Sequence, residues 1–407
     1  MKFKKWFSGL LLLFLLMLGA AAQAEEESVQ EYTIGVAVYD PNSTEMHMFI
    51  NYYQNYIEEG FPVKFYFSEQ LASPEDEADF IRSMKEIGAR GIISFAGYDL
   101  PGALAVCEEE EVYYVLGSGI VSDENYEKVK DNPWFLGSVG PRLEDVHQTG
   151  RNMAEFFIGS GAGNFLIMTG GASKSNTLHA LRTQGMLEVL QEKEGLVLEE
   201  TAEVLARSGE LVTLQNEDQS VSVTLCPDYT EGGEGLTNLE TAFGQREYDV
   251  LMSAFHASTY LDRIAEKEAS QGRNIMVGAI DSFTEENFVI MQEEDAFGNP
   301  PIDYVEGKYA SMAGPAFAML YNAMSGHPET NTPDGKAVRL YQSFWAASGK
   351  EAYIELYSYT SGIYENAYSC EDLMKVISVF HEDAGPEELK ELAQACTVED
   401  VKARILQ

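Results

Sequence analysis

Short apolar runs rich in β-branched and aromatic residues alternate with amphipathic segments in the first third of the chain. Runs of the first kind are typical of strands, and apolar positions that recur every three or four residues are typical of helices. The predicted strands are 32–39, 63–67, 91–96, 112–116 and 135–139. Because a single helical segment separates most neighbours, we expect parallel strands joined by right-handed crossovers in a doubly wound α/β lobe.

The same alternation starts again near residue 142. The segment 142–158 places its apolar side chains on one helical face. Further strands are predicted at 164–168, 248–254 and 274–280. The stretch 197–225 is too long for one strand, and its Ser208–Gly209 pair predicts the turn of an inserted hairpin. The predicted fold class is therefore α/β, with two doubly wound parallel-sheet lobes joined by a three-strand hinge around a ligand cleft.

The clearest helix start in the first lobe follows residue 72. Ser73 is a favoured N-cap residue, Pro74 suits the first helical turn, and Asp76 is a capping-box partner. The expected buried stripe of this helix is Ile81, Met84 and Ile87.

The N-terminus has the pattern of a secretory signal peptide. Basic residues come first, an apolar run extends from Leu10 to Leu18, and small residues at Ala22 and Ala24 suit signal peptidase. An uncleaved anchor is the alternative, but the apolar run falls short of the ~20 residues that span a bilayer. We expect cleavage after about Ala24 and a soluble mature protein in the periplasm or outside the cell.

The charge and the length narrow the class of protein. The 407 residues include 66 acidic and 27 basic side chains, which gives a formal net charge of −39. A surface this acidic repels nucleic acid phosphates, and no basic stripe interrupts it, so nucleic acid is excluded as a partner. A chain of this length exceeds what one core usually organises, which agrees with two lobes.

The four cysteines are Cys107, Cys226, Cys370 and Cys396. In an oxidising compartment, Cys370 and Cys396 are the candidate disulfide pair, because both lie in the C-terminal tail. Cys107 lies on an apolar helix face and is expected to be a buried thiol. The spacings do not indicate a metal site, and no cofactor is predicted.

Ligands of open parallel sheets bind beyond the carboxyl ends of the strands, so the residues that follow each strand are the candidate site. These positions combine aromatic rings with carboxylates, amides and one arginine, which suits a neutral polyhydroxylated ligand. The first-lobe candidates are Tyr39, Asp40, Asn42, Tyr98, Asp99 and Ser118, and the second-lobe candidates are Arg182, Phe255, His256 and Asp281.

Two of these residues have a structural alternative. His256, beside an aromatic residue, is expected to be a hydrogen-bonded wall of the site rather than a catalyst. Asp281 is also a candidate N-cap for the helix that follows it, and capping is compatible with ligand contact.

The loop in 168–185 lacks the spacing of a nucleotide phosphate cradle, so Lys174 and Ser175 are not a Walker pair. The glycine-rich run 159–164 precedes its strand, which excludes a dinucleotide fingerprint. Two interpretations stay open. Either the glycines of the loop only turn the chain and Arg182 pairs with a surface acid, or the loop contacts ligand and Arg182 points into the cleft.

Three stretches together resemble the type I periplasmic binding proteins, the ribose- and galactose-binding group. They are DVHQTGRNMAEFF at 145–157, TGGASKSNTLHALRTQGM at 169–186 and VGAIDS at 277–282. The resemblance implies that Arg182 and Asp281 hydrogen-bond sugar hydroxyls and that Asp40 and Asp99 lie near first-lobe contacts. The sequence departs from the family at Phe255-His256 and at Gly117-Ser118-Gly119.

The resemblance also implies three crossings between the lobes, which places Glu306 or Lys308 at the hinge edge of the site. The implied organisation is a signal peptide (1–24), an N-terminal lobe (32–140 and 308–340), a C-terminal lobe (141–306 and 341–349) and a helical extension (350–407) whose role the sequence does not assign.

The function that follows from the resemblance is that of a monomeric solute-binding protein that delivers a small polar ligand, a sugar, to a membrane ABC importer. The alternatives are a periplasmic receptor for a sensor kinase or chemoreceptor, and a nucleoside-binding protein. The chain is not expected to be an enzyme, since it has no nucleophile elbow. Opposed acids such as Asp99 and Asp281 keep catalysis open as an alternative.

Overall fold

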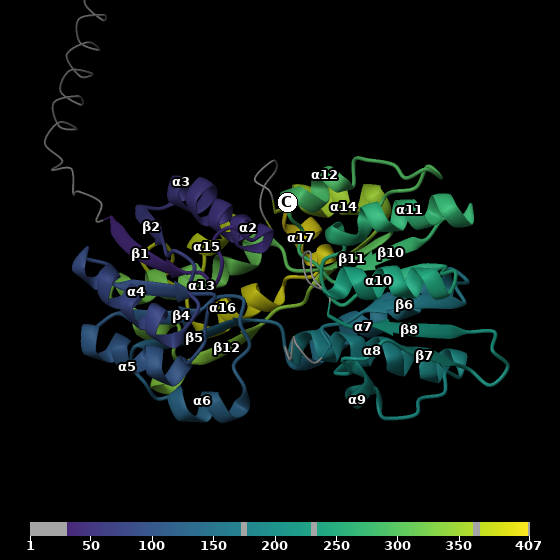
Figure 1. Ribbon diagram of the computed structural model, residues 1–407. Coiled ribbons are helices and arrows are strands. Elements are labelled where there is room, and N and C mark those ends of the chain that lie inside the picture. Colours follow the sequence, from purple (N-terminus) through teal and green to yellow (C-terminus); the bar gives the residue numbers. More distant parts are fainter. Residues whose placement is uncertain (1–30, 172–176, 229–233, 361–366, 406–407) are drawn as a thin grey trace, which may run out of the picture.

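The computed structural model describes residues 31–171, 177–228, 234–360 and 367–405, which form two sheets covered by helices (Figure 1). The first sheet is entirely parallel, in the order β12-β5-β4-β3-β1-β2. Its strands are β1 (Tyr32–Ala37), β2 (Val63–Phe67), β3 (Gly91–Ser94), β4 (Tyr113–Leu116), β5 (Phe135–Gly140) and β12 (Val338–Tyr341). The prediction of a parallel, doubly wound lobe is confirmed.

The helices of the first lobe follow the predicted alternation. They are α2 (Thr44–Tyr52), which continues as a π-helical turn (Tyr53–Ile57) into α3 (Glu58–Gly60), and then α4 (Pro74–Glu86), α5 (Leu100–Glu110), α6 (Asp123–Val129) and α13 (Gly314–Met324). Helix α4 begins as predicted, because Ser73 Oγ accepts a hydrogen bond from the Asp76 amide at 3.2 Å. The end of its predicted stripe is wrong, since Ile87 is half exposed while Ile81 and Met84 are buried.

The second sheet has the order β13-β11-β10-β9-β6-β8-β7. Its interior is parallel, and its two edge strands, β7 and β13, are antiparallel to their neighbours. Its strands are β6 (Asn164–Met168), β7 (Val212–Gln215), β8 (Ser222–Cys226), β9 (Val250–Ser253), β10 (Met276–Ala279), β11 (Tyr304–Gly307) and β13 (Trp345–Ser348). Its helices include α7 (Leu143–Gly159), α8 (Thr177–Glu194), α10 (Glu234–Gln245), α11 (Leu261–Gln271) and α12 (Glu285–Ile290).

The inserted hairpin exists, but its predicted turn at Ser208–Gly209 is wrong. Thr201 caps a short helix, α9 (Ala202–Ala206), which occupies the first part of the segment 197–225. The hairpin of β7 and β8 turns instead at 216–221, where the Asn216 side-chain oxygen accepts a hydrogen bond from the Val221 amide.

The two sheets repeat one strand order. Reading β2-β1-β3-β4-β5 beside β8-β6-β9-β10-β11 gives the same flavodoxin-like sequence of neighbours. In each sheet the order reverses next to the first strand, between β1 and β3 or between β6 and β9. Such switch points leave a crevice at the carboxyl ends of the strands, and the loops that follow these strands are therefore where a ligand is expected.

The chain passes between the two sheets three times. It leaves the first sheet after β5, returns after β11 to form α13 and β12, and leaves again between β12 and β13. Lys308 directly follows β11, at the second of these passages. Among the described residues, no helix has the length and apolar character needed to cross a membrane.

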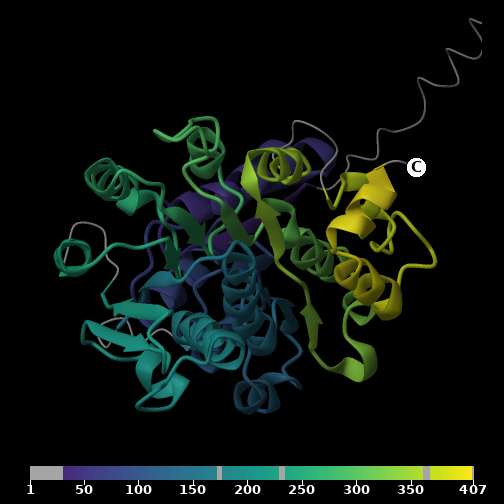
Figure 2. The same ribbon diagram turned by 90° about the vertical axis from the view of Figure 1, so that its right-hand side faces the viewer.

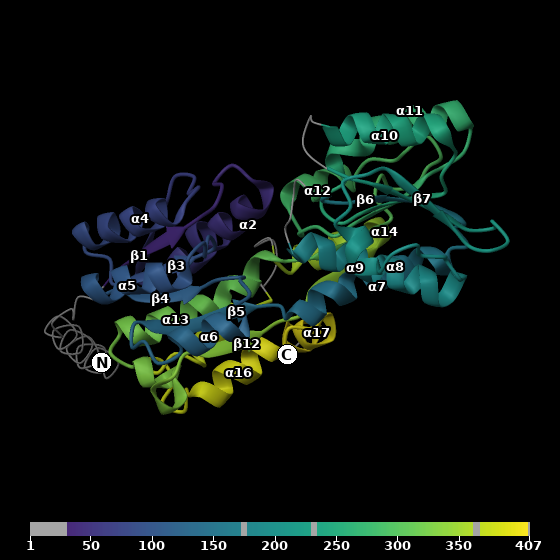
Figure 3. The ribbon, with the colours of Figure 1, turned by 60° about the horizontal axis from the view of Figure 1, so that its bottom comes forward.

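Of the C-terminal helices, α15 (Cys370–Met374), α16 (Pro386–Gln394) and α17 (Val398–Ile405) gather on one side of the molecule, whereas α14 (Gly349–Ser358) lies apart from them against the second lobe (Figure 2). Tyr353 of α14 stacks on Phe283 of the second lobe at 4.9 Å. In the first lobe, α16 packs against β12 and α13 (Figure 3). Every residue of α13 is buried, because the sheet covers one side of this helix and the C-terminal helices cover another.

The predicted pairing of Cys370 with Cys396 is wrong, because none of the four cysteines, all of which the structure describes, forms a disulfide. Cys370 packs against the backbone of Tyr56, whereas Cys396 accepts a hydrogen bond from the Ser343 amide at 3.2 Å. The two thiols therefore serve different contacts. Cys107 is buried, as predicted.

Candidate functional site

The loops after β3 in the first lobe and β9 in the second lobe are shaped by a serine at the strand end. In the first lobe, Ser94 Oγ accepts hydrogen bonds from the amides of Ala96 and Gly97. In the second lobe, Ser253 Oγ accepts from the Phe255 amide and donates to the His256 carbonyl at 2.9 Å. These bonds fix the loops that carry Tyr98 and His256.

Arg182 is brought to the second-lobe switch point by the packing of α8 on α7. Two glycines permit the close approach: a Cβ at Gly150 would overlap the Arg182 carbonyl, and one at Gly185 would overlap the His147 carbonyl. The Arg182 side chain is 8% exposed, so the alternative in which it pairs with a surface acid is wrong. It is held beneath the ends of β9 and β10, where Nη1 donates to the carbonyls of Ala254 at 2.9 Å and Ile280 at 3.4 Å.

The Arg182 guanidinium retains unused hydrogen-bonding capacity. Its Nε is buried without a hydrogen-bond partner among the described residues. Burial lowers the pKa of Arg182 to about 10, and the charges of Glu45, Asp281 and Glu306 oppose that shift. None of these three described carboxylates forms an ion pair with Arg182, although the charge of each raises its pKa. The Nε–H group is therefore suited to donate a hydrogen bond to a hydroxyl group of a bound ligand.

Two of the surrounding carboxylates are held by neighbours of their own lobe. Asp281 accepts hydrogen bonds from the Ser282 amide at 2.6 Å and from Asn287 Nδ2 at 2.7 Å. Burial raises the pKa of Asp281, while the bond from Asn287 and the nearby His256 oppose the increase. The alternative role of Asp281 as a helix cap is wrong, because Thr284 caps α12.

Glu306 is the most deeply buried acid of this group, at 5% exposed. Its carboxylate accepts hydrogen bonds from Tyr304 Oη at 2.6 Å and from Asn152 Nδ2 at 3.0 Å. Burial raises its pKa to about 6, although both bonds and the charge of Arg182 favour the ionised form.

Glu45 and Lys308 complete a charged cluster, defined as Glu45, Arg182, Asp281, Glu306 and Lys308. Glu45 lies in the first turn of α2, and its carboxylate accepts hydrogen bonds from Lys308 Nζ at 2.8 Å, Ser282 Oγ at 2.9 Å and Tyr39 Oη at 3.2 Å. Residues that follow β1, β10 and β11 thus meet at one carboxylate.

An aromatic wall adjoins the second-lobe part of this cluster. The ring centroids of Phe255 and His256 are 4.4 Å apart, and those of Phe255 and His179 are 5.1 Å apart. His256 Nδ1 lies 3.4 Å from Thr259 Oγ1, and the proximity of His256 opposes the increase in the pKa of Asp281. His256 therefore has the hydrogen-bonded setting expected of a wall residue.

Among the described residues, the remaining first-lobe candidates have hydrogen-bond partners within the first lobe. Asp40 accepts a hydrogen bond from the amide of Asn42 at 2.9 Å. Tyr98 donates to the Leu71 carbonyl at 2.7 Å, and Asp99 precedes α5 without capping it. The described contacts do not bring these four residues to the charged cluster.

Ser118 follows β4 in a conformation that non-glycine residues rarely adopt, with φ of 55°. Its Oγ is buried and has no hydrogen-bond partner among the described residues. An unsatisfied hydroxyl at a strand end, in a strained backbone, is the first-lobe feature that most resembles a prepared contact.

Sequence reasoning missed Glu45, Asn152 and Asn287 as parts of the site. Glu45 lies in the first turn of α2 with no strand end beside it, and Asn152 lies within a helix whose pattern indicated packing. The loop residues 172–176, which include Lys174 and Ser175, lie outside the described residues.

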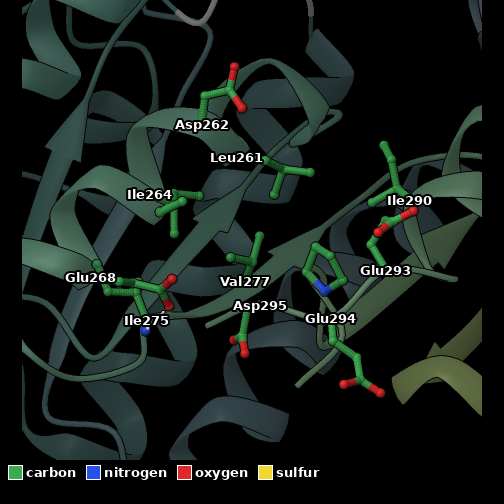
Figure 4. Close-up of a pocket in the computed structure, with 12 residues that line it drawn as sticks. Leu261, Asp262, Ile264, Glu268, Ile275, Val277, Ile290, Glu293, Glu294 and Asp295 are labelled. Carbon is green, nitrogen blue, oxygen red and sulfur yellow. Dashed lines mark hydrogen bonds between the residues drawn. The ribbon is translucent and has the colours of Figure 1, made fainter. Parts of the chain in front are cut away.

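A separate hollow of about 250 Å³ lies on the second lobe, where α11 and the segment after α12 flank β10 (Figure 4). Its floor is apolar, with Ile264, Ile275 and Val277, and acidic side chains such as Asp262 and Glu293 stand around it. None of the predicted site residues lines it.

No protein-family model matches the sequence, and no curated protein matches it. Solved structures match the fold. A galactofuranose binding protein matches with a TM-score of 0.53 at 13% identity, over 81% of this chain and 98% of that chain. A periplasmic solute binding protein of an ABC transporter from Actinobacillus succinogenes 130z, with bound D-allose, matches with 0.53 at 11% identity, over 80% and 99%.

A third match is the fructose binding periplasmic domain of a hybrid two-component system, with a TM-score of 0.51 at 13% identity, over 80% of this chain and 93% of that chain. The chain therefore has the two-lobe α/β fold of periplasmic binding proteins, and the resemblance to the type I group is confirmed at the level of the fold.

Proposed function

We propose that the protein is an extracytoplasmic solute-binding protein that holds a small neutral sugar between its two lobes and releases it unchanged. The observation that carries this proposal is the buried guanidinium of Arg182. Among the described residues its Nε has no hydrogen-bond partner, and the nearby carboxylates of Glu45, Asp281 and Glu306 form no ion pair with it. Alternating donors and acceptors around an enclosed point match the hydroxyl groups of a sugar ring.

In this proposal, Arg182 and Asp281 contact hydroxyls from the second lobe, and Phe255 with His256 covers an apolar face of the ring. Ser118 and the loops that carry Asp40, Asn42, Tyr98 and Asp99 complete the site from the first lobe. The excess of carboxylates over cations in the charged cluster disfavours ligands that carry phosphate or carboxylate groups.

The proposed partner is a membrane ABC importer that recognises the ligand-bound form of the protein. The protein is proposed to be a monomer that is secreted by means of the N-terminal segment 1–24, which lies outside the described residues. Sensing is a second candidate, favoured by the match to a fructose binding periplasmic domain of a two-component system. Both roles need the same binding step, in which ligand stabilises one arrangement of the lobes. A nucleoside ligand is a further alternative, and catalysis is not proposed.

A thermal-shift screen tests the binding step. The panel is D-galactose, L-arabinose, D-allose, D-fructose, myo-inositol, uridine and glucose 6-phosphate. A ligand present at about 100 times its Kd adds about 2.7 kcal/mol to the unfolding free energy, so at least one neutral sugar should raise the melting temperature. Glucose 6-phosphate should not. Stabilisation by uridine alone would favour the nucleoside alternative, and no stabilisation by any sugar would contradict the proposal.

A further inference from the structure

Glu45 connects the two lobes through one carboxylate. It belongs to α2 of the first lobe, whereas Ser282 directly follows Asp281 in the second lobe, and Lys308 follows the second-lobe strand β11. Oε2 of Glu45 accepts from Ser282 Oγ at 2.9 Å, and Oε1 accepts from Lys308 Nζ at 2.8 Å. Helix α2 also contacts α12.

Two of the partners of Glu45, Ser282 in the second lobe and Lys308 at the passage between the lobes, are tied to one another. The Phe283 amide donates to the Lys308 carbonyl at 2.8 Å, and the Ser282 amide donates to Asp281 Oδ1 at 2.6 Å. Glu45 therefore hydrogen-bonds to the loop that includes Asp281. The same loop is hydrogen-bonded to Lys308 at the passage between the lobes.

This bridge is shielded from solvent. The Glu45 side chain is 22% exposed and that of Lys308 is 19% exposed. An ion pair in such a setting is screened less by water and salt than a surface pair, and removing one partner leaves the other charge poorly solvated. Moving the second lobe away from α2 here would break the bond of Glu45 to Ser282, and the bond to Lys308 holds the same carboxylate at the passage between the lobes.

We propose that Glu45 is a positioning residue that keeps the Asp281 loop of the second lobe against α2 and so keeps the ligand site assembled. The proposal rests on the proposed function for the identity of the site, but the bridge itself acts in the absence of ligand. Glu45 differs from the other candidate residues because it holds the site together by contacting a lobe other than its own.

Hydrogen exchange of the full protein without added sugar tests this inference. In Glu45→Ala, the amides of Ser282 and Phe283 should exchange about tenfold faster or more, the change that about 1.4 kcal/mol produces. The radius of gyration from small-angle X-ray scattering should increase in the same variant.

Glu58→Ala is the matched control, because Glu58 pairs with Lys64 at 2.7 Å within the first lobe. It should leave exchange at 282–283 unchanged. Ser282→Ala and Lys308→Met each remove one partner of Glu45 and replace Glu45→Ala if that variant does not fold.

Wild-type exchange at 282–283 in the folded Glu45 variant would overturn the inference, and so would an equal acceleration in Glu58→Ala. No sugar is present in this experiment. Its outcome is therefore independent of the thermal-shift screen, whose failure would contradict the proposed function alone.

Discussion

Arg182 Nη1 donates a hydrogen bond to the carbonyl oxygen of Ala254 at 2.9 Å, and this bond fixes a buried guanidinium at the point where β9 ends. The strand order of the second sheet reverses beside β9, so the charge lies where the fold leaves its crevice. The backbone satisfies one nitrogen of Arg182 and leaves Nε without a partner among the described residues.

Replacing Arg182 with methionine should weaken sugar binding by about 2 kcal/mol, a factor of about thirty, because a charge-assisted hydrogen bond is lost. The unfolding free energy should stay within about 1 kcal/mol of wild type, since lost hydrogen bonds are offset by the removed cost of burying a charge. Calorimetric titration and urea unfolding measure the two effects. The control is Arg151→Met, which removes an arginine that pairs with Glu192 of α8 and should bind sugar as wild type does. Wild-type affinity in Arg182→Met would show that Arg182 is not part of the site.

Glu306 should make stability depend on pH. Burial raises its folded-state pKa from 4.5 to about 6, so the folded protein holds this proton more tightly than the unfolded chain does. The stabilising contribution is present below about pH 4.5 and is lost as the pH rises through about 6. Glu306→Gln should abolish this loss and gain about 2 kcal/mol relative to wild type between pH 4.5 and 7.5.

Urea unfolding across that pH range measures the gain. Glu293→Gln, at an exposed position, is the control and should follow the wild-type curve. Burial also raises the pKa of Asp303 to about 6. The unfolding free energy of both variants should therefore still fall somewhat as the pH rises. A Glu306→Gln curve parallel to wild type would show that the carboxylate does not titrate in this window.

The contact between the C-terminal helices and the passage into β13 should contribute to stability. Trp345 is buried, stacks on Tyr309 at 3.8 Å and donates from Nε1 to the Cys396 carbonyl at 2.8 Å. Trp345→Phe should lower the unfolding free energy by about 1 to 3 kcal/mol, because the Cys396 carbonyl loses its donor. The control is Trp134→Phe, at a half-buried position in the first lobe. Equal losses would mean that ring size alone accounts for the effect.

The cysteines should behave as four thiols. Burial raises the pKa of Cys226 to about 12 and also raises the pKa values of Cys107 and Cys396, which makes these thiols unreactive in the folded protein. Titration with a thiol reagent should modify at most Cys370 before denaturation and all four cysteines afterwards. Two thiols missing after denaturation without reductant would reveal a disulfide.

The fold could be predicted from the sequence because its signals are local. Strand 164–168 was predicted with its observed bounds, and Ser73 caps α4 as expected. The local signals failed where a competing local contact or a tertiary contact decided the outcome. Thr201 starts a short helix where a hairpin arm was predicted, and Cys396 turns to Ser343 instead of Cys370.

The site could be predicted only in part, since its residues meet across long sequence distances. Strand ends identify Arg182 and Asp281, because the carboxyl ends of parallel strands share one edge. Glu45 meets Ser282 across 237 positions and Lys308 across 263, and nothing near it in the sequence indicates either partner.

A crystal structure of the protein grown with the neutral sugar that most raises its melting temperature would show where the ligand binds. The account predicts one intact sugar between the lobes, with hydroxyls within hydrogen-bonding distance of Arg182 and Asp281 and a ring face against Phe255 or His256. Density for the sugar in the hollow beside α11, or a cleaved product between the lobes, would contradict it.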